Sequence, residues 1–145
     1  MTEITLGFEV HQPLRLNRVF NEDLVRGRTV APDELFDIYF NNVWNRGILS
    51  RVAKKCYYPS NELMLENIDR YKSEKKKFKL AYSISGVLLE QCELWERDLL
   101  DSFKQLAETG LVEFLDQTYY HSLASLYPDR TEFIEQVNNH RQLMK

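Results

Sequence analysis

Four side chains in this sequence combine chemical reactivity with positions at or beside the ends of predicted β-strands. They are His11, Gln12, Glu113 and His121. Imidazole, amide and carboxylate groups can hold sugar hydroxyls by hydrogen bonds, and a carboxylate can also act as a general acid or base. Two aromatic residues, Tyr119 and Tyr120, directly precede His121 and offer rings that can stack on a sugar. The pattern favours a carbohydrate-binding site.

Glu113 allows two interpretations. It interrupts the apolar run Leu111-Val112-Glu113-Phe114-Leu115, which predicts a short buried strand. A carboxylate is costly to bury unless it is paired or used in chemistry. Glu113 is therefore expected either to bind or protonate substrate, or to be paired with a structural partner inside the fold.

A metal site made from His11, His121 and a carboxylate is a further alternative, but no short-spaced pair of ligands supports it. The chain also lacks a glycine-rich phosphate loop and a Gly-x-Ser-x-Gly elbow. We therefore expect no metal and no cofactor. His140, on a helix, is expected at the surface, and Cys56 and Cys92 are expected to be small buried hydrophobes.

Three segments show the alternation of a strand: residues 3–10, 78–85 and 111–115. In the first, Ile4, Leu6, Phe8 and Val10 share one face. The opposite face is small or ionisable and ends at His11, before Pro13 stops the ladder. In the second, bulky apolar residues again alternate with small or polar ones, of which the last is Ser85. Each strand thus predicts one face for packing and one polar face.

Helical spacing predicts helices that begin near residues 32, 48, 60, 87, 98 and 129. The run Tyr57-Tyr58-Pro59 is expected to separate the second helix from the third, and Asp129 with Glu132 resembles a capping box. The poorly periodic stretch between residues 14 and 28 predicts a loop over the candidate site.

Strands separated by helical crossovers predict an α/β fold with a parallel sheet, and no boundary divides residues 1–145 into domains. The polar groups would then meet at the carboxyl edge of that sheet. A formal net charge of −3 gives no reason to expect nucleic-acid binding. No apolar stretch approaches the ~20 residues of a membrane span and no leader segment is evident, so we expect a cytoplasmic protein that does not bind a membrane.

Three motifs in order resemble the family 57 glycoside hydrolases. Phe8-Glu9-Val10-His11-Gln12-Pro13 is similar to the first signature of that family. The segment from Tyr82 to Gln91 resembles the stretch between the first two signatures in the α-amylase-like branch. The segment from Gly110 to Leu115, running on to Leu123, resembles the second signature.

The resemblance implies a parallel-stranded (β/α)7 barrel, of which this chain would form about the first three β/α units. It also implies retaining chemistry on α-glucans, in which the early signatures supply substrate-binding groups, here His11, Gln12, Glu113 and His121. The family's glutamate nucleophile and aspartate acid/base belong to its third and fourth signatures, and nothing in residues 122–145 resembles either. No catalytic residue is therefore assigned.

These observations leave three hypotheses. The chain is the substrate-binding part of an α-glucan-active hydrolase or glucanotransferase, inactive alone and requiring the rest of its barrel. Alternatively, it is a non-catalytic carbohydrate-binding or split-protein module that needs a partner chain. The third hypothesis is a metal-dependent deacetylase-like enzyme on a related barrel.

Overall fold

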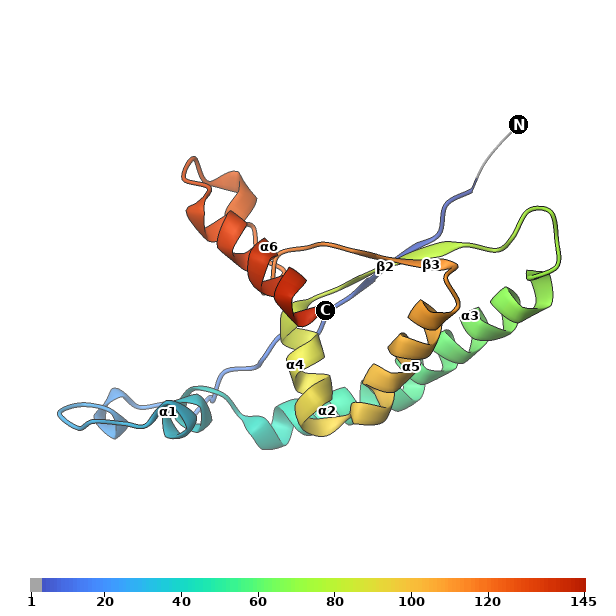
Figure 1. The fold of residues 1–145 in the computed structure, drawn as a ribbon. Helices are drawn as coiled ribbons and strands as arrows, with labels where there is room; N and C mark the ends of the chain where they lie inside the picture. The colour runs from blue at the N-terminus through green and yellow to red at the C-terminus, as the bar shows by residue number, and fades with distance from the viewer. Residues whose placement is uncertain (1–3) are drawn as a thin grey trace.

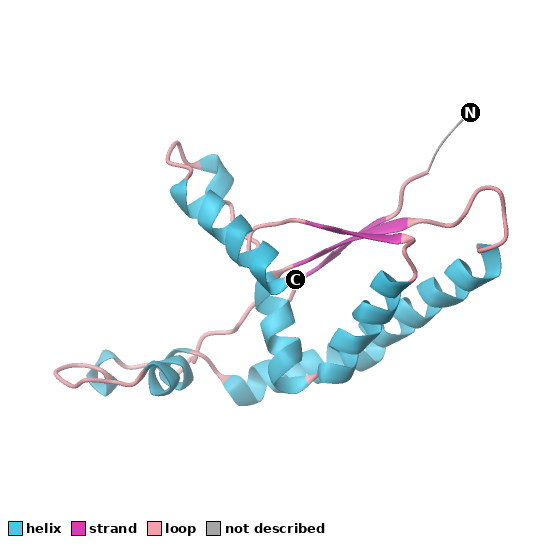
Figure 2. Cartoon of the chain, viewed as in Figure 1, coloured by secondary structure: helices cyan, strands magenta, loops and turns pink. Residues whose placement is uncertain are grey.

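The computed structural model describes residues 4–145, and Glu3 of the predicted first strand lies outside this range. Three parallel strands alternate with helices, which confirms the predicted α/β class (Figures 1 and 2). The elements are β1 (Gly7–Val10), α1 (Pro32–Tyr39), α2 (Asn42–Val52), α3 (Tyr58–Tyr71), β2 (Leu80–Ile84), α4 (Gly86–Trp95), α5 (Arg97–Glu108), β3 (Val112–Leu115) and α6 (Thr131–Leu143). Strand β2 lies between β1 and β3.

An aromatic row crosses the sheet from strand to strand. Phe8, Tyr82 and Phe114 are direct partners in the register of β1, β2 and β3. The Phe8 and Tyr82 rings stack with centroids 5.1 Å apart, and the Tyr82 and Phe114 rings stack at 6.0 Å. Cross-strand aromatic pairs of this kind stabilise one register over its alternatives.

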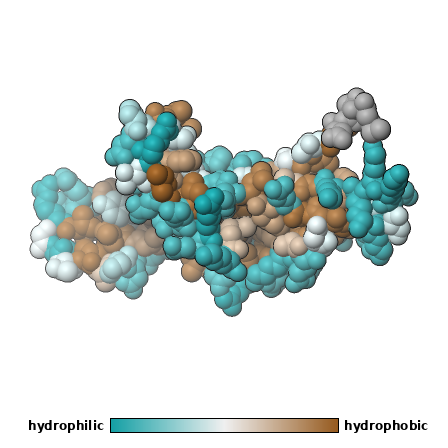
Figure 3. Space-filling model, turned by 45° about the horizontal axis from the view of Figure 1, so that its top comes forward, coloured by the Kyte–Doolittle hydropathy of each residue, from teal (hydrophilic) through white to brown (hydrophobic). Residues whose placement is uncertain are grey.

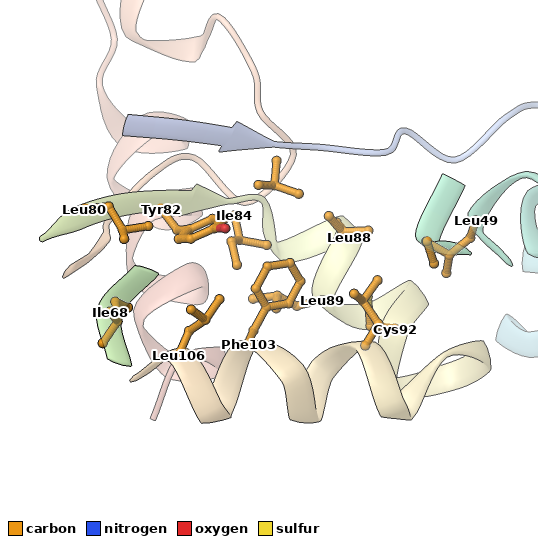
Figure 4. Packing of buried hydrophobic residues seen from close by; sticks show 13 residues of the cluster. Leu49, Ile68, Leu80, Tyr82, Ile84, Leu88, Leu89, Cys92, Phe103 and Leu106 are labelled. Carbon is orange, nitrogen blue, oxygen red and sulfur yellow. The ribbon is translucent and has the colours of Figure 1, made fainter. Parts of the chain in front are cut away.

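Helices cover the face of the sheet on which this row lies. Leu80, Tyr82 and Ile84 of β2 pack on α4 and α5, as Figure 4 shows for Phe103 and Leu106. The Tyr82 hydroxyl donates to Asn61 Oδ1 of α3 at 3.1 Å, and Asn61 in turn donates to Ser102 of α5. The buried phenol is therefore paired rather than left without a partner.

The opposite face of the sheet is not covered by α3, α4 or α5, which lie together on one side in Figures 1 and 2. Glu9 and Glu113 point to this open face and are exposed. Within the described residues, β1 begins at Gly7, later than predicted. Ile4 is 84% exposed, and Leu6 joins the ladder through its carbonyl, which accepts from the Ala81 amide.

Two predictions about residues 53–60 are wrong. The chain does not break at Tyr57-Tyr58-Pro59, since a π-helical turn at Ala53–Tyr57 joins α2 directly to α3. In a regular helix the ring of Pro59 would clash with the carbonyl of Lys55, four residues earlier. The wider π-helical turn contains Lys55. Cys56 lies in this turn and is exposed, whereas it was predicted to be buried. Cys92 is buried as predicted, and burial, assisted by Glu96, raises the pKa of its thiol to about 12.

His140 was predicted at the surface but is fully buried. Its Nε2 donates to the carbonyl oxygen of Ile84, at the end of β2, over 2.7 Å. The hydrogen bond ties α6 to the carboxyl end of the sheet. The predicted capping box is only half formed: Asp129 accepts from the Thr131 amide, whereas Glu132 accepts from Gln136.

The segment between β1 and α1 is irregular, as predicted, apart from a 3-10 turn at Glu22–Leu24. It does not cover the edge of the sheet, and instead projects away from it together with α1 (Figure 1). Hydrophobic side chains gather over this part of the molecule (Figure 3). Those exposed at its surface include Leu16, Val19, Phe20, Leu24, Leu35 and Tyr39.

None of the helices within residues 4–145 combines the length and apolar character needed to cross a membrane.

Gly86 at the start of α4 is expected to be intolerant of a side chain. A Cβ atom there would lie 2.5 Å from Cδ2 of the Tyr119 ring. Gly86→Ala is therefore expected to lower the free energy of unfolding by about 1–3 kcal/mol, the usual cost of overpacking. Urea denaturation measures the change.

Gly47 is the matched control, because a Cβ atom there meets nothing within 4 Å in the middle of α2. Gly47→Ala is expected to stabilise the chain by roughly 0.5–1 kcal/mol. In a Tyr119→Ala background the cost of Gly86→Ala should shrink, and an unchanged cost in the double-mutant cycle would rule out the Tyr119 clash.

Candidate functional site

Two histidines that lie 110 positions apart in sequence meet at the carboxyl edge of the sheet. The rings of His11 and His121 have centroids 4.7 Å apart and planes inclined by 30°. His11 follows β1 and His121 lies in the connection after β3. The predicted convergence of these two residues is therefore present in the fold.

His11 is held by the strand next to its own. Val10 and Ile84 are register partners at the ends of β1 and β2, so the residues that follow them, His11 and Ser85, are also neighbours. Nδ1 of His11 lies 2.7 Å from Oγ of Ser85, which is fully buried. This contact fixes the orientation of the imidazole.

The pKa of His11 is lowered from its ordinary value, mainly because partial burial disfavours the charged ring. The neighbouring His121 lowers this pKa further, and Glu9 opposes both effects by raising it. The site thus favours a neutral His11, which has one nitrogen that donates and one that accepts.

His121 has a left-handed backbone conformation with φ of 54°, which is uncommon for residues other than glycine. Its Nδ1 lies 3.1 Å from Gln117 Oε1 and 3.4 Å from Glu9 Oε1. Both neighbours are acceptors, so Nδ1 carries a proton and donates. Gln117 also donates from Nε2 to Glu9 at 3.3 Å, so His121, Gln117 and Glu9 form a small ring of three polar side chains in mutual contact.

The connection that carries His121 is fixed at several points. The His121 amide donates to the Thr118 carbonyl, and the Ser122 amide donates to Thr118 Oγ1. The Val87 amide at the start of α4 donates to the Tyr119 carbonyl at 3.1 Å. The unusual backbone of His121 is therefore maintained by its surroundings, an arrangement that is concentrated at functional sites.

Gln12 does not join the histidines through its side chain. Its Nε2 donates to the Tyr57 hydroxyl at 3.1 Å, and its Oε1 accepts from Arg15. Its backbone carbonyl accepts from Nε2 of the buried Gln91 at 2.6 Å. Gln12 is thus part of the support that connects the end of β1 to α4 and to the π-helical turn.

Glu113 was predicted to be a carboxylate in a buried strand, and this is wrong. It is exposed on the open face, beside Ala81 in the register, because the helices cover the opposite face of β3. It therefore needs no structural partner. The structure places it on the strand, away from the ring formed by Glu9, Gln117 and His121 at the edge.

Glu9, Ser85 and Gln117 belong to the cluster but were not among the predicted substrate-binding residues, although the sequence places Ser85 and Gln117 among the polar groups at strand ends. Glu9 could have been assigned to the site from the sequence, because it lies two residues before His11 and side chains two residues apart in a strand share a face. Ser85 and Gln117 follow or end strands in the sequence but are joined to the histidines only through the register. Gln91 lies within a helix, and no pattern pointed to its contact with Gln12.

Within residues 4–145, no group of three or more histidine, cysteine, aspartate or glutamate side chains is arranged to hold a metal ion. Nδ1 of each histidine in the pair already contacts a protein group. The arrangement can instead present imidazole nitrogens, a carboxylate and an amide to hydroxyl groups, and can exchange a proton with them.

The two ionisable neighbours of His11, namely His121 and Glu9, change its pKa in opposite directions. His121→Gln is expected to raise this pKa without restoring its ordinary value, because burial is the largest cause of the shift. Glu9→Gln is expected to lower it. An NMR titration of the His11 Cε1 proton measures both changes, and a shift in the same direction for both variants would contradict the assigned contacts.

The direction of the pKa shift of His11 also determines how the free energy of unfolding depends on pH. Between the lowered pKa and 6.5, the unfolded chain binds more protons at His11 than the folded chain, so His11 makes stability fall as the pH drops below 6.5. His11→Gln should therefore lose less stability than the parent chain between pH 7.5 and pH 5.5.

Comparison with known proteins is consistent with this architecture. The model of the glycosyl hydrolase family 57 matches residues 5–145. The "Putative alpha-amylase" of Methanocaldococcus jannaschii is 44% identical over 142 residues, which are 98% of this chain and 28% of that protein. The chain therefore spans little more than a quarter of the length of this curated relative.

A solved structure shows the same fold. The 4-alpha-glucanotransferase from Thermococcus litoralis superposes with a TM-score of 0.59 and 21% identity, covering 96% of this chain and 17% of that one. Because the family model covers nearly all of the residues, and the relative is similar along the same length, the chain belongs to glycosyl hydrolase family 57.

Proposed function

We propose that this chain supplies substrate-binding groups to an α-glucan-active retaining glycosidase or glucanotransferase, with His11 and His121 holding the hydroxyls of one sugar. The observation that carries the proposal is the meeting of the two imidazoles at the carboxyl edge of a parallel sheet, where α/β folds bind their ligands. Membership of glycosyl hydrolase family 57 favours an α-glucan as the substrate class.

The electrostatics of the edge fit a neutral, polyhydroxylated ligand. Both histidines use Nδ1 for contacts within the protein, so Nε2 of each is the nitrogen that can meet a substrate. Glu9 adds a carboxylate that accepts from hydroxyl groups, and it is half exposed. Sugar recognition depends on such convergent donors and acceptors that are already oriented before the ligand arrives.

We further propose that β1 to β3 begin a (β/α)7 barrel whose interior is lined by the open face of this sheet. Two features support this proposal: α3, α4 and α5 lie together on one face, and the other face carries the exposed carboxylates Glu9 and Glu113. The nucleophile and the acid/base would come from chain beyond Lys145 or from a partner chain.

A non-catalytic carbohydrate-binding or split-protein module is the second candidate. It makes the same use of His11 and His121, but no continuation of the chain would complete the reaction. Redistribution of maltohexaose chain lengths, followed by chromatography together with reducing-sugar release, separates the candidates. The glycosidase or glucanotransferase proposal expects new products only when downstream coding sequence is included, whereas unchanged maltohexaose with both versions favours the module.

Sugar binding by the histidine pair is directly testable on the 145-residue chain. Addition of maltohexaose is expected to shift the Cε1 proton resonances of both His11 and His121, because the ligand would contact both rings. The buried His140 provides the control within the same spectrum, since it bonds the Ile84 carbonyl and should not move. Shifts confined to His140, or none at millimolar sugar, would contradict the proposed site.

Glu113→Gln tests whether the open face also contacts substrate. Because Glu113 is exposed, the substitution should change the free energy of unfolding by no more than about 0.5 kcal/mol. In the active, completed protein it should raise KM for α-glucan. A lowered melting temperature with unchanged KM would instead assign Glu113 a structural role.

A further inference from the structure

Trp44 stands at an exposed hollow that the proposed function does not use. Trp44 is 37% exposed and lies on α2. The open hollow beside it has a volume of about 670 Å³, within the range of about 300–1,000 Å³ that is usual for small-ligand sites. Its lining consists of Asn41, Val43, Trp44, Gly47, Ile48 and Arg51.

The lining follows one side of a helix that faces solvent. Trp44, Gly47, Ile48 and Arg51 are spaced by three and four residues and therefore share one face of α2. Gly47 has no side chain to fill the space, and a Cβ atom added there would meet nothing within 4 Å. The hollow is thus an apolar surface that has Gly47, which lacks a side chain, in its middle and the polar residues Asn41 and Arg51 at its border.

The indole is held in place before any ligand arrives. The guanidinium of Arg18 lies over its ring at 4.7 Å from the centroid, within cation–π range. Asn41 Oδ1 accepts from the Trp44 amide at 2.9 Å and caps the helix. Neither Arg18 nor Arg15 lines the larger hollow; Arg18 borders a second, smaller one of about 280 Å³ that shares Trp44 and Asn41.

These groups match the chemistry of a sugar ring. An indole stacks on the apolar C–H face of a pyranose, and an amide and a guanidinium can bond its equatorial hydroxyls. Among residues 4–145, the lining of the hollow includes no carboxylate and has Arg51 as its single formally charged residue, so polar contacts to hydroxyl groups come from Asn41 and Arg51. We propose that this hollow, which we call the Trp44 subsite, binds one glucose unit of an α-glucan.

The Trp44 subsite is linked to the residues that follow β1. Arg15 donates from one guanidinium nitrogen to Gln12 Oε1, and the same guanidinium lies 6.0 Å from the centre of the Trp44 ring. The buried Asn45 binds both the amide and the carbonyl of Arg15 and so fixes its backbone against α2. One α-glucan chain can therefore extend from the histidine pair toward Trp44. This inference takes its ligand class from the proposed function.

The chain contains two tryptophans, so Trp95→Phe leaves Trp44 as the sole indole fluorophore. Titration of this variant with maltohexaose is expected to give a saturable change in Trp44 emission. Adding Gly47→Leu should fill the hollow and weaken the apparent affinity at least about tenfold. The same substitution should leave the melting temperature equal or higher, because leucine favours a helix more than glycine does.

Matched variants separate the two sites. Gly47→Ala adds a single methyl group to the same position and should retain most of the affinity. His11→Gln should keep a saturable Trp44 response, with a weaker apparent affinity because one maltohexaose chain would lose its contact with the histidine pair. If His11→Gln abolishes the response while Gly47→Leu does not, the sugar binds only at the histidine pair and the Trp44 subsite is wrong.

Two further results would overturn the inference: no emission change at millimolar maltohexaose, or a response to inorganic phosphate without one to the sugar. A third result separates this inference from the proposed function of the histidine pair. If the Trp44 emission responds to maltohexaose but the His11 and His121 resonances do not, the Trp44 subsite stands and the role of the histidine pair fails.

Discussion

The stacked row of Phe8, Tyr82 and Phe114 determines how the three strands align, and the candidate site depends on that alignment. Side chains alternate between the faces of a strand, so a slip of one strand by one residue would turn the aromatic ring of that strand to the open face. The row also receives an edge-to-face contact from Phe103 of α5, with centroids 5.7 Å apart. Helix packing and register therefore stabilise each other.

The same register carries through to the polar edge. With Val10 opposite Ile84, the next residue of each chain segment places His11 beside Ser85, and Glu9 extends from the open face toward Gln117 and His121. His140 bonds the carbonyl of Ile84 at this position, so α6 is attached to the strand that also positions Ser85. Packing on one side of the sheet thus controls chemistry at its end.

Most of the fold could be predicted from the sequence, because alternation and helical spacing are local signals. The second strand and the helix that begins at Gly86 illustrate this. The π-helical turn before Pro59 was missed because proline is normally read as a helix break, and an inserted residue has no sequence signature of its own. His140 was misassigned because its burial depends on Ile84, 56 positions earlier.

The site was only partly predictable for the same reason. Histidines at strand ends are visible in the sequence, but the groups that orient them come from other elements through the register. Glu113 shows the opposite error: an apolar run implies burial, yet the face of β3 to which Glu113 points has no helix over it. Sequence patterns reveal which residues share a face, whereas only the assembled layers reveal which face is covered.

Arg15 gives the polar edge a physical connection to the exposed part of the molecule around α1 and α2. Its backbone is bound at both the amide and the carbonyl by the buried Asn45, while its guanidinium reaches Gln12 and approaches Trp44. Such a doubly bound backbone keeps the end of β1 and the start of α2 at a fixed separation. An α-glucan chain that contacted both the end of β1 and α2 would lose conformational entropy on binding. The protein would lose little, because its binding groups are already in position. Recognition of a chain rather than of a single sugar is the property that this construction favours.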